Sequence, residues 1–279
     1  MRPRRHLLLS LALAGCASES APQGVDGITG VFRSGEADIA YALDVPRGRG
    51  RHPAVVLVHG SGRTTIEDQR VLAEQFMSRG FAVLRYDKRG AGSSGGVYRG
   101  VGTSNSEEMF QLLASDAARA IDLLAAREGI DTTRLGLVGV SQAGWIIPVA
   151  ASLAPAADFA ILIVGPTVSV GMENYYSALV EENDAPLGGI SEKLAAYTGP
   201  HGFDPLDHLR RMRQPALWLF GARDRSIPTA ECVARLQTLI AEEAKPFSFR
   251  VYPLAGHDLG GIIWPDVDAW LASTVRRAP

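Results

Sequence analysis

Three residues that could together carry out nucleophilic catalysis each follow a continuous apolar run. They are Ser141, Asp224 and His257. A serine hydroxyl is a weak nucleophile unless a histidine takes its proton and a carboxylate orients that histidine. Apolar runs of this kind are typical of strands covered on both faces, and parallel strands bring their carboxyl ends to one edge of a sheet. We therefore expect the three side chains to meet at that edge.

The turn around Ser141 departs by one position from the usual G-x-S-x-G pattern. Here it is GVSQAG, with Ala143 in the fifth place and Gly144 one residue later. A serine in such a turn must adopt a positive φ, a strain typical of functional sites. Position 143 has to be small rather than flexible, so alanine can serve there. The alternative is that Ser141 only caps the following helix, as serines often do.

Five short motifs occur in order along the chain: HGSG, YDKRGAGSS, GVSQAG, GARDRSIP and AGHDL. Together they resemble the α/β-hydrolase superfamily, near the esterases of its dienelactone-hydrolase and prolyl-oligopeptidase-like branch. The resemblance covers roughly residues 28 to 277. It implies that Ser141 is the nucleophile, that His257 acts as general base and then acid, and that Asp224 is the orienting carboxylate, in the family's chain order.

The same resemblance implies an oxyanion hole made of two backbone N–H groups. One would belong to Gln142, directly after the nucleophile, and the other to Ser61 in the HGSG loop. Gly62 is a less favoured second donor.

The elements that must position these residues alternate between strand and helix. Such alternation predicts an α/β fold with a mostly parallel, doubly wound sheet. An N-terminal antiparallel hairpin is expected over 28–34 and 37–45, and a small helical cap over about 165–214. The remaining strands are expected at 54–58, 81–86, 135–140, 159–164, 216–220 and 247–252, and the helices at 65–79, 107–128, 142–154, 228–243 and 265–277.

Several other residues have competing interpretations. Asp258 is a rival acid, but it adjoins His257 in sequence and is badly placed to reach its ring. His59 matches the family's oxyanion-loop histidine and is expected to be structural. Cys232, in a helical pattern without an activating cluster, is expected to be a buried thiol.

Some residues are expected to support the site or its pocket. Arg85 and Asp87 are expected to hold the Gly-rich loop that follows them in shape. Four further side chains either line a pocket or pack the cap against the sheet, and the sequence leaves this open: Trp145, Met172, Tyr175 and Tyr176.

The N-terminal residues are typical of a bacterial lipoprotein signal. A basic stretch, MRPRR, precedes the apolar stretch 7–15, and small residues lead into Cys16. The apolar stretch is too short to span a bilayer. We expect a signal peptide over 1–15, lipidation of Cys16, a polar tether over 16–27 and a hydrolase domain over 28–279. The resemblance implies an extracytoplasmic protein anchored in the outer membrane if the source is Gram-negative. An ordinary signal peptide is the alternative.

Composition narrows the possible partners. The chain has 279 residues, 46% of them hydrophobic and 21% charged, with a net charge of −2. This is ordinary for a globular domain, and no basic stripe that could bind nucleic acid follows the first five residues. No metal-ligand spacing or nucleotide-binding motif occurs, so no cofactor is expected. The sequence favours hydrolysis of a small-molecule ester. A peptidase or acyltransferase, or a non-catalytic binding lipoprotein, remains an alternative.

Overall fold

The computed structural model describes residues 24–48, 50–183 and 189–275. The predicted signal peptide, Cys16 and most of the predicted tether lie outside these residues.

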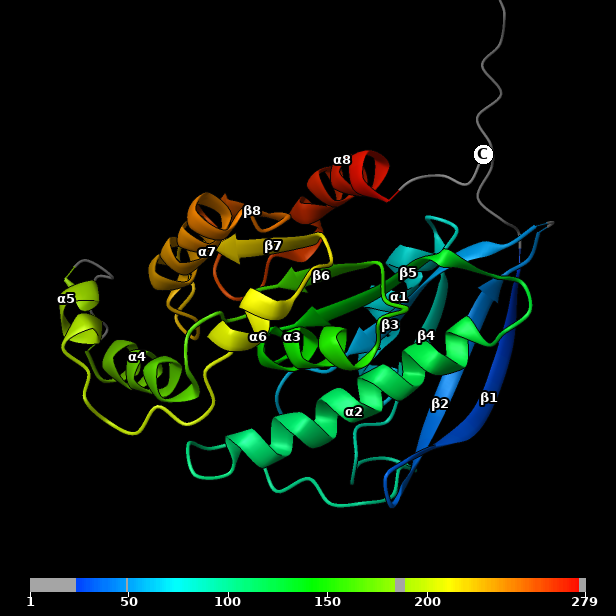
Figure 1. The fold of residues 1–279 in the computed structure, drawn as a ribbon, viewed down its shortest axis with the longest axis horizontal. Coiled ribbons are helices and arrows are strands. Elements are labelled where there is room, and N and C mark those ends of the chain that lie inside the picture. The colour runs from blue at the N-terminus through cyan, green and yellow to red at the C-terminus, as the bar shows by residue number, and fades with distance from the viewer. Residues whose placement is uncertain (1–23, 49, 184–188, 276–279) are drawn as a thin grey trace, which may run out of the picture.

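The described strands form one eight-stranded sheet, in the order β1-β2-β4-β3-β5-β6-β7-β8. The first two strands form an antiparallel hairpin whose second strand also pairs antiparallel with β4, and the remaining neighbours are parallel. This confirms the predicted fold class (Figure 1). The strand bounds are β1 Val25–Ser34, β2 Ala37–Pro46, β3 His52–Val58, β4 Ala82–Tyr86, β5 Ile130–Val140, β6 Phe159–Ile163, β7 Ala216–Gly221 and β8 Phe247–Tyr252.

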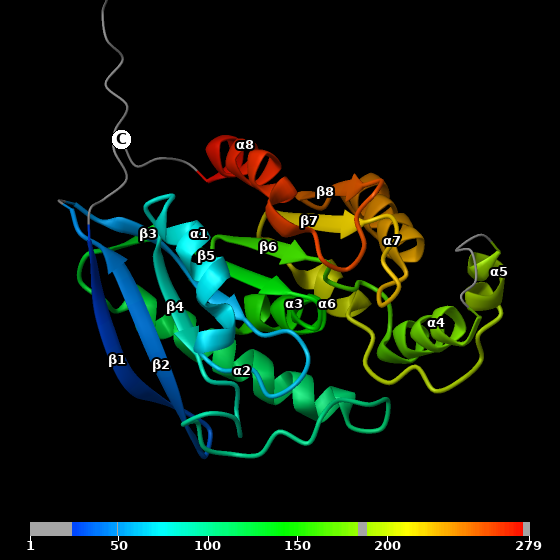
Figure 2. The ribbon, with the colours of Figure 1, turned by 180° about the vertical axis from the view of Figure 1, so that it is seen from behind.

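Helices cover both faces of this sheet, as Figures 1 and 2 show from opposite sides. Helices α2, α3, α6 and α7 contribute buried residues to the apolar cluster on one face, whereas α1 and α8 contribute to the cluster on the other. The helix bounds are α1 Arg70–Met77, α2 Ser106–Ala125, α3 Ala143–Leu153, α4 Val170–Asn183, α5 Ile190–Ala195, α6 Leu206–Arg211, α7 Thr229–Glu243 and α8 Trp264–Thr274, with single 3-10 turns at Glu67–Gln69 and Gly260–Ile263.

Strand β3 illustrates why a continuous apolar run forms a central strand. Val56 packs into the cluster under α2 and α3, whereas its neighbours Val55 and Leu57 pack into the cluster under α1 and α8. Successive strand residues point to opposite faces, so a strand covered on both sides must be apolar throughout. The sheet is thereby fixed rigidly enough to hold groups at its carboxyl edge.

In the part of the insertion between β6 and β7 that the structure describes, there are three helices, α4, α5 and α6. Helices α4 and α5 form a small apolar cluster of their own, centred on Tyr176, Val180, Ile190 and Leu194. They project beyond the carboxyl ends of the strands, whereas α6 lies beside α3 (Figure 1). Within the described residues, no helix has the length and apolar character needed to cross a membrane.

Candidate active site

Ser141 occupies a strained turn between β5 and α3. Its φ is 55°, as predicted, and its N–H donates to the carbonyl of Ile163 at 2.9 Å. The turn is closely packed: a Cβ added to Gly139 would lie 2.3 Å from the Cβ of Ala143, and one added to Gly144 would lie 2.5 Å from the backbone of Gly165. Position 143 therefore needs a small side chain, and the strict glycine requirement falls on residues 139 and 144.

Asp224 and His257 are in direct contact. His257 Nδ1 lies 2.8 Å from Asp224 Oδ2, and the Asp224 side chain is fully buried. The other carboxylate oxygen accepts the N–H groups of Ser226 at 2.8 Å and Ile227 at 2.9 Å. Both oxygens are thus held in place, so the carboxylate can fix the orientation of the imidazole ring.

His257 borders a hollow with a volume of about 410 Å³, at the same sheet edge as Ser141. Its wall also includes Val140, which directly precedes Ser141, and Ile163, whose carbonyl accepts the Ser141 N–H. In the described part of the chain, Ser141 makes no side-chain hydrogen bond to His257. Hydrolases without substrate often have this contact long and close it when substrate binds. The remaining wall comes from the 3-10 turn before α1, from α1 itself and from the 258–264 segment. It is mainly apolar, and its polar side chains are Asp68, Gln75 and Asp258.

The two predicted oxyanion donors are both available. Within the described residues, the backbone N–H groups of Ser61 and Gln142 donate to no acceptor. The loop that carries Ser61 lies against the serine turn, because a Cβ added to Gly60 would meet the Val140 carbonyl at 3.4 Å and the Ser141 Cβ at 3.9 Å. Gln142 directly precedes α3, where free N–H groups and the helix dipole favour negative charge.

The competing residues have structural contacts of their own. His59 Nε2 donates to the Tyr86 carbonyl at 2.6 Å, and burial lowers the pKa of this histidine to about 3. Asp258 is exposed and accepts the N–H of Gly260 rather than a hydrogen from His257. Burial raises the pKa of Cys232 to about 11, so its thiol is not a ready nucleophile.

Asp87 holds the Gly-rich loop that follows it, as predicted, whereas Arg85 bonds to the loop after β3 and to β2 instead. Asp87 accepts the N–H groups of Ile66 at 2.8 Å and Ser93 at 2.7 Å. Arg85 donates to the Ile66 carbonyl and pairs with Asp44 at 2.6 Å.

The side chains whose role was left open mostly pack. Trp145 is 5% exposed, donates to the Val168 carbonyl at 2.7 Å and lies against Phe110. It belongs to the core beneath α3 and not to a pocket floor. Tyr176 donates to the backbone carbonyl of Asp224 at 2.5 Å, so it ties the cap to the loop that carries the acid. Tyr175 stacks on Tyr197, and Met172 packs at the border of the cap cluster.

Glu173 is a residue of the site that sequence reasoning missed. It lies on α4 one turn before Tyr176 and Ser177, which bond to the backbone of the 224–226 loop. Desolvation by burial raises its pKa to about 7, the nearby His257 lowers it, and the charge of Asp224 raises it. In the sequence, a glutamate three residues before a tyrosine in a helix does not indicate a site residue, because its position near His257 depends on how the cap packs.

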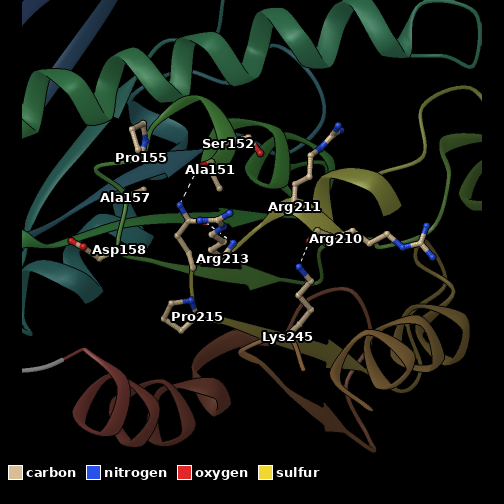
Figure 3. A pocket seen from close by; sticks show the side chains of 11 residues that line it. Ala151, Ser152, Pro155, Ala157, Asp158, Arg210, Arg211, Arg213, Pro215 and Lys245 are labelled. Carbon is tan, nitrogen blue, oxygen red and sulfur yellow. Dashed lines mark hydrogen bonds between the residues drawn. The ribbon is translucent and has the colours of Figure 1, made fainter. Parts of the chain in front are cut away.

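A second, larger hollow lies at the opposite edge of the sheet (Figure 3). Its volume is about 970 Å³, and it is lined by the residues that precede β6, β7 and β8, together with α6 arginines and the end of α3. None of the predicted site residues lies in its wall. Among the described residues, no group of three or more His, Cys, Asp or Glu side chains could hold a metal ion.

Comparison with known proteins places the chain in a family. The family model of the prolyl oligopeptidase family matches residues 69–269. The chain belongs to this family. This prolyl oligopeptidase family member is 26% identical over 230 residues to the esterase EstD of Thermotoga maritima, a match that covers 72% of this chain and 53% of that protein. The chain thus spans about half the length of the curated relatives it matches most broadly.

Solved structures give the fold of this family member. It superposes on an acetyl xylan esterase from a Thermoanaerobacterium species with a TM-score of 0.64 at 18% identity, over 90% of this chain and 88% of that one. It superposes on an esterase of Pyrococcus furiosus with a TM-score of 0.68 at 16% identity, over 90% and 92% of the two chains. The fold is that of the α/β hydrolases, as predicted.

Proposed function

We propose that the protein is a serine hydrolase that cleaves carboxylic esters with short to medium acyl chains through an acyl-enzyme on Ser141. The observation that carries this proposal is the hydrogen bond from His257 to the buried Asp224, at the same sheet edge as a serine held at positive φ. Structural turns and plain helix caps do not need this combination of strain and a buried, doubly held carboxylate.

Each step of the reaction has a group to perform it. His257 takes the proton of the Ser141 hydroxyl as the serine oxygen attacks the ester carbonyl, and Asp224 stabilises the resulting imidazolium. The N–H groups of Ser61 and Gln142 bind the oxyanion. His257 then protonates the departing alcohol. Water, activated by the same histidine, releases the acid from Ser141.

The hollow beside His257 and the relatives support the proposed substrate class. A space of about 410 Å³ with apolar side chains from α1 and the 257–264 segment suits a short alkyl chain better than a long one. Each methylene group of the acyl chain contributes about 0.8 kcal/mol to binding only while it lies inside the hollow. The match to the Thermotoga maritima esterase favours ester substrates. Membership of the prolyl oligopeptidase family makes peptide hydrolysis the second candidate.

A series of chromogenic substrates distinguishes these two activities. We expect kcat/KM to be highest for p-nitrophenyl esters between acetate and hexanoate and to fall for longer acyl chains, with little cleavage of peptide anilides. A maximum at dodecanoate or beyond would contradict the assigned pocket. Faster cleavage of a peptide anilide than of any ester would favour the peptidase.

We also propose that the protein is extracytoplasmic and anchored by lipid on Cys16. The support is the basic stretch, the apolar stretch and the small residues that lead into this cysteine. Several acyl chains together hold a protein stably on a membrane. Cys16→Ser should move the protein out of the detergent phase or block its maturation, with Cys232→Ser as the matched control. Unchanged partitioning of Cys16→Ser would refute lipidation.

A further inference from the structure

Lys88 is a fully buried lysine behind the predicted oxyanion hole. It lies in the loop after β4, and its side chain reaches the space between the HGSG loop and the serine turn. Its Nζ donates to the carbonyls of Gly60 at 2.6 Å and Gly62 at 2.8 Å, and to Oε1 of Gln142 at 3.1 Å. The ring of Tyr98 lies 4.4 Å from the same nitrogen. The ammonium thus contacts both segments that supply the oxyanion donors.

This lysine differs from the buried cation next to it in the chain. Arg89 forms a two-pronged ion pair with the buried Asp116, at 2.6 and 3.1 Å. Among the described residues, no carboxylate bonds to Lys88. Burial alone lowers its pKa to about 7, while three acceptor oxygens engage the three hydrogens that only the ammonium form supplies. A buried charge without a counterion destabilises a fold. Lys88 therefore does not serve stability, and its role must lie in the function of the site.

The geometry of the Gly60–Ser61 peptide indicates this role of Lys88. In a trans peptide the C=O and the next N–H point to opposite sides. The Gly60 carbonyl points at Lys88, so the N–H of Ser61 points to the other side of the loop. That N–H donates to no acceptor among the described residues, and the loop lies against Ser141. The Gly62 carbonyl fixes the loop a second time, beyond Ser61.

The second donor is held through its own side chain. Gln142 is 4% exposed, and its Oε1 accepts from Lys88 while its backbone N–H has no acceptor among the described residues. This contact fixes the residue and so the direction of its backbone N–H. In the Gly60–Ser61 peptide, the hydrogen bond to the carbonyl also polarises the amide and strengthens the N–H of Ser61 as a donor. The Lys88 ammonium therefore bonds to the peptide that carries the Ser61 donor and to the side chain of Gln142, which carries the second donor.

We propose that Lys88 is a positioning residue that aligns both donors of the oxyanion hole and polarises the Ser61 donor. The proposal rests on the proposed function, because an oxyanion forms only if Ser141 attacks a carbonyl. Lys88 acts on the charge that develops in the transition state and not on the bound ester. Its loss should therefore lower kcat while KM changes little.

The test is Lys88→Met, which keeps the length of the side chain and removes the charge. Loss of a single oxyanion donor typically lowers kcat by roughly 10² to 10³. We expect kcat on p-nitrophenyl butyrate to fall about 10²-fold with KM within about threefold, and the melting temperature to stay equal or rise. Arg89→Met is the matched control. It should lower the melting temperature by about 10 °C, because it leaves Asp116 buried without a partner, and keep kcat of the folded enzyme.

Gln142→Met supplies a second variant that leaves the lysine in place. It should lower kcat about tenfold, and combining it with Lys88→Met should add little, because both changes release the same alignment. The rate of labelling by a fluorophosphonate should follow the same order. Wild-type enzyme that labels at Ser141 while Lys88→Met labels and turns over at the same rate would overturn the role of Lys88 and leave the proposed function standing. Wild-type enzyme that fails to label at Ser141 would overturn both proposals.

Discussion

The two edges of the sheet differ in the way their polar groups are held. At the amino edge, the larger hollow is lined by arginines and a lysine that are exposed or bonded to nearby backbone, such as Lys245 to the carbonyls of Arg210 and Met212 (Figure 3). At the carboxyl edge, the hollow is smaller, but Asp224 is buried and Ser141 is held at positive φ. Catalytic groups must be held with their solvation and geometry constrained, so buried polarity and strain locate chemistry better than cavity size does.

The strain at the carboxyl edge extends beyond the nucleophile. Val164, directly after β6, also has a positive φ, 45°, which is rare for a β-branched residue. The N–H of Ser141 bonds to the residue just before it. The two strained residues, Ser141 and Val164, are therefore linked through the Ser141–Ile163 hydrogen bond. We expect the amino edge of the sheet to tolerate substitution better than the carboxyl edge.

The largest effect should come from Ser141→Ala. Removing a triad nucleophile lowers kcat by on the order of 10⁴ to 10⁶. The fold should persist, because the serine side chain makes no hydrogen bond in the described residues. Steady-state turnover of p-nitrophenyl butyrate and thermal melting check the two parts. Retention of a tenth of the wild-type rate would remove Ser141 from the mechanism.

Asp224→Asn should rank next, with a loss of about 10⁴-fold in kcat. The amide can still hold the imidazole, but it favours the wrong tautomer and cannot stabilise the imidazolium. Asp258→Asn is the matched control. Asp258 lines the hollow but bonds only to Gly260 in the described residues, and the amide keeps its shape, so kcat should stay within about twofold. If Asp258→Asn were the more damaging change, the acid would be misassigned.

Glu173→Gln should change stability in a pH-dependent way. Burial raises the folded pKa of Glu173 from 4.5 to about 7, so the folded state holds a proton that the unfolded state loses between these values. Stability from this group is present below pH 4.5 and is lost as pH rises through 7. The variant should match wild type near pH 4 and exceed it by about 2 kcal/mol at pH 8, less than the full shift because water reaches part of the side chain.

Urea unfolding at pH 4, 6 and 8 measures this difference. Glu192→Gln, at an exposed position of α5 in the same cap, is a suitable control and should show no trend. A constant difference between Glu173→Gln and wild type across this range would mean that Glu173 does not lie in a desolvated position.

The smallest effect is expected at the amino edge. Replacing both Arg211 and Arg213 with alanine should leave kcat within about twofold and the melting temperature within about 2 °C, because exposed charges contribute little. Both arginines line the larger hollow and are exposed. A tenfold loss of kcat would show that this hollow takes part in the reaction and would break the contrast between the edges.

Much of the fold could be predicted because its rules are local. Continuous apolar runs marked the strands, and helices between them required a mostly parallel sheet, as found. The helix predicted over 265–277 instead spans Trp264–Thr274. Such ends depend on capping contacts and are rarely fixed by periodicity alone.

The site was predictable to the extent that it follows strand ends. Asp224 and His257 each come just after a strand, so the chain order sufficed to bring them together. Lys88 stands inside the conspicuous YDKRG motif, yet its role depends on which carbonyls face it. Trp145 could not be assigned between pocket and core, because that choice depends on the direction its side chain takes from α3.

The most direct test of the central claim is the mass of the enzyme after reaction with a fluorophosphonate. The account predicts one equivalent of label, located by peptide mapping on the peptide that contains Ser141. It also predicts no label on Ser141→Ala and strongly slowed labelling of His257→Ala. Label on another serine, or an unmodified enzyme that still hydrolyses p-nitrophenyl butyrate, would contradict it.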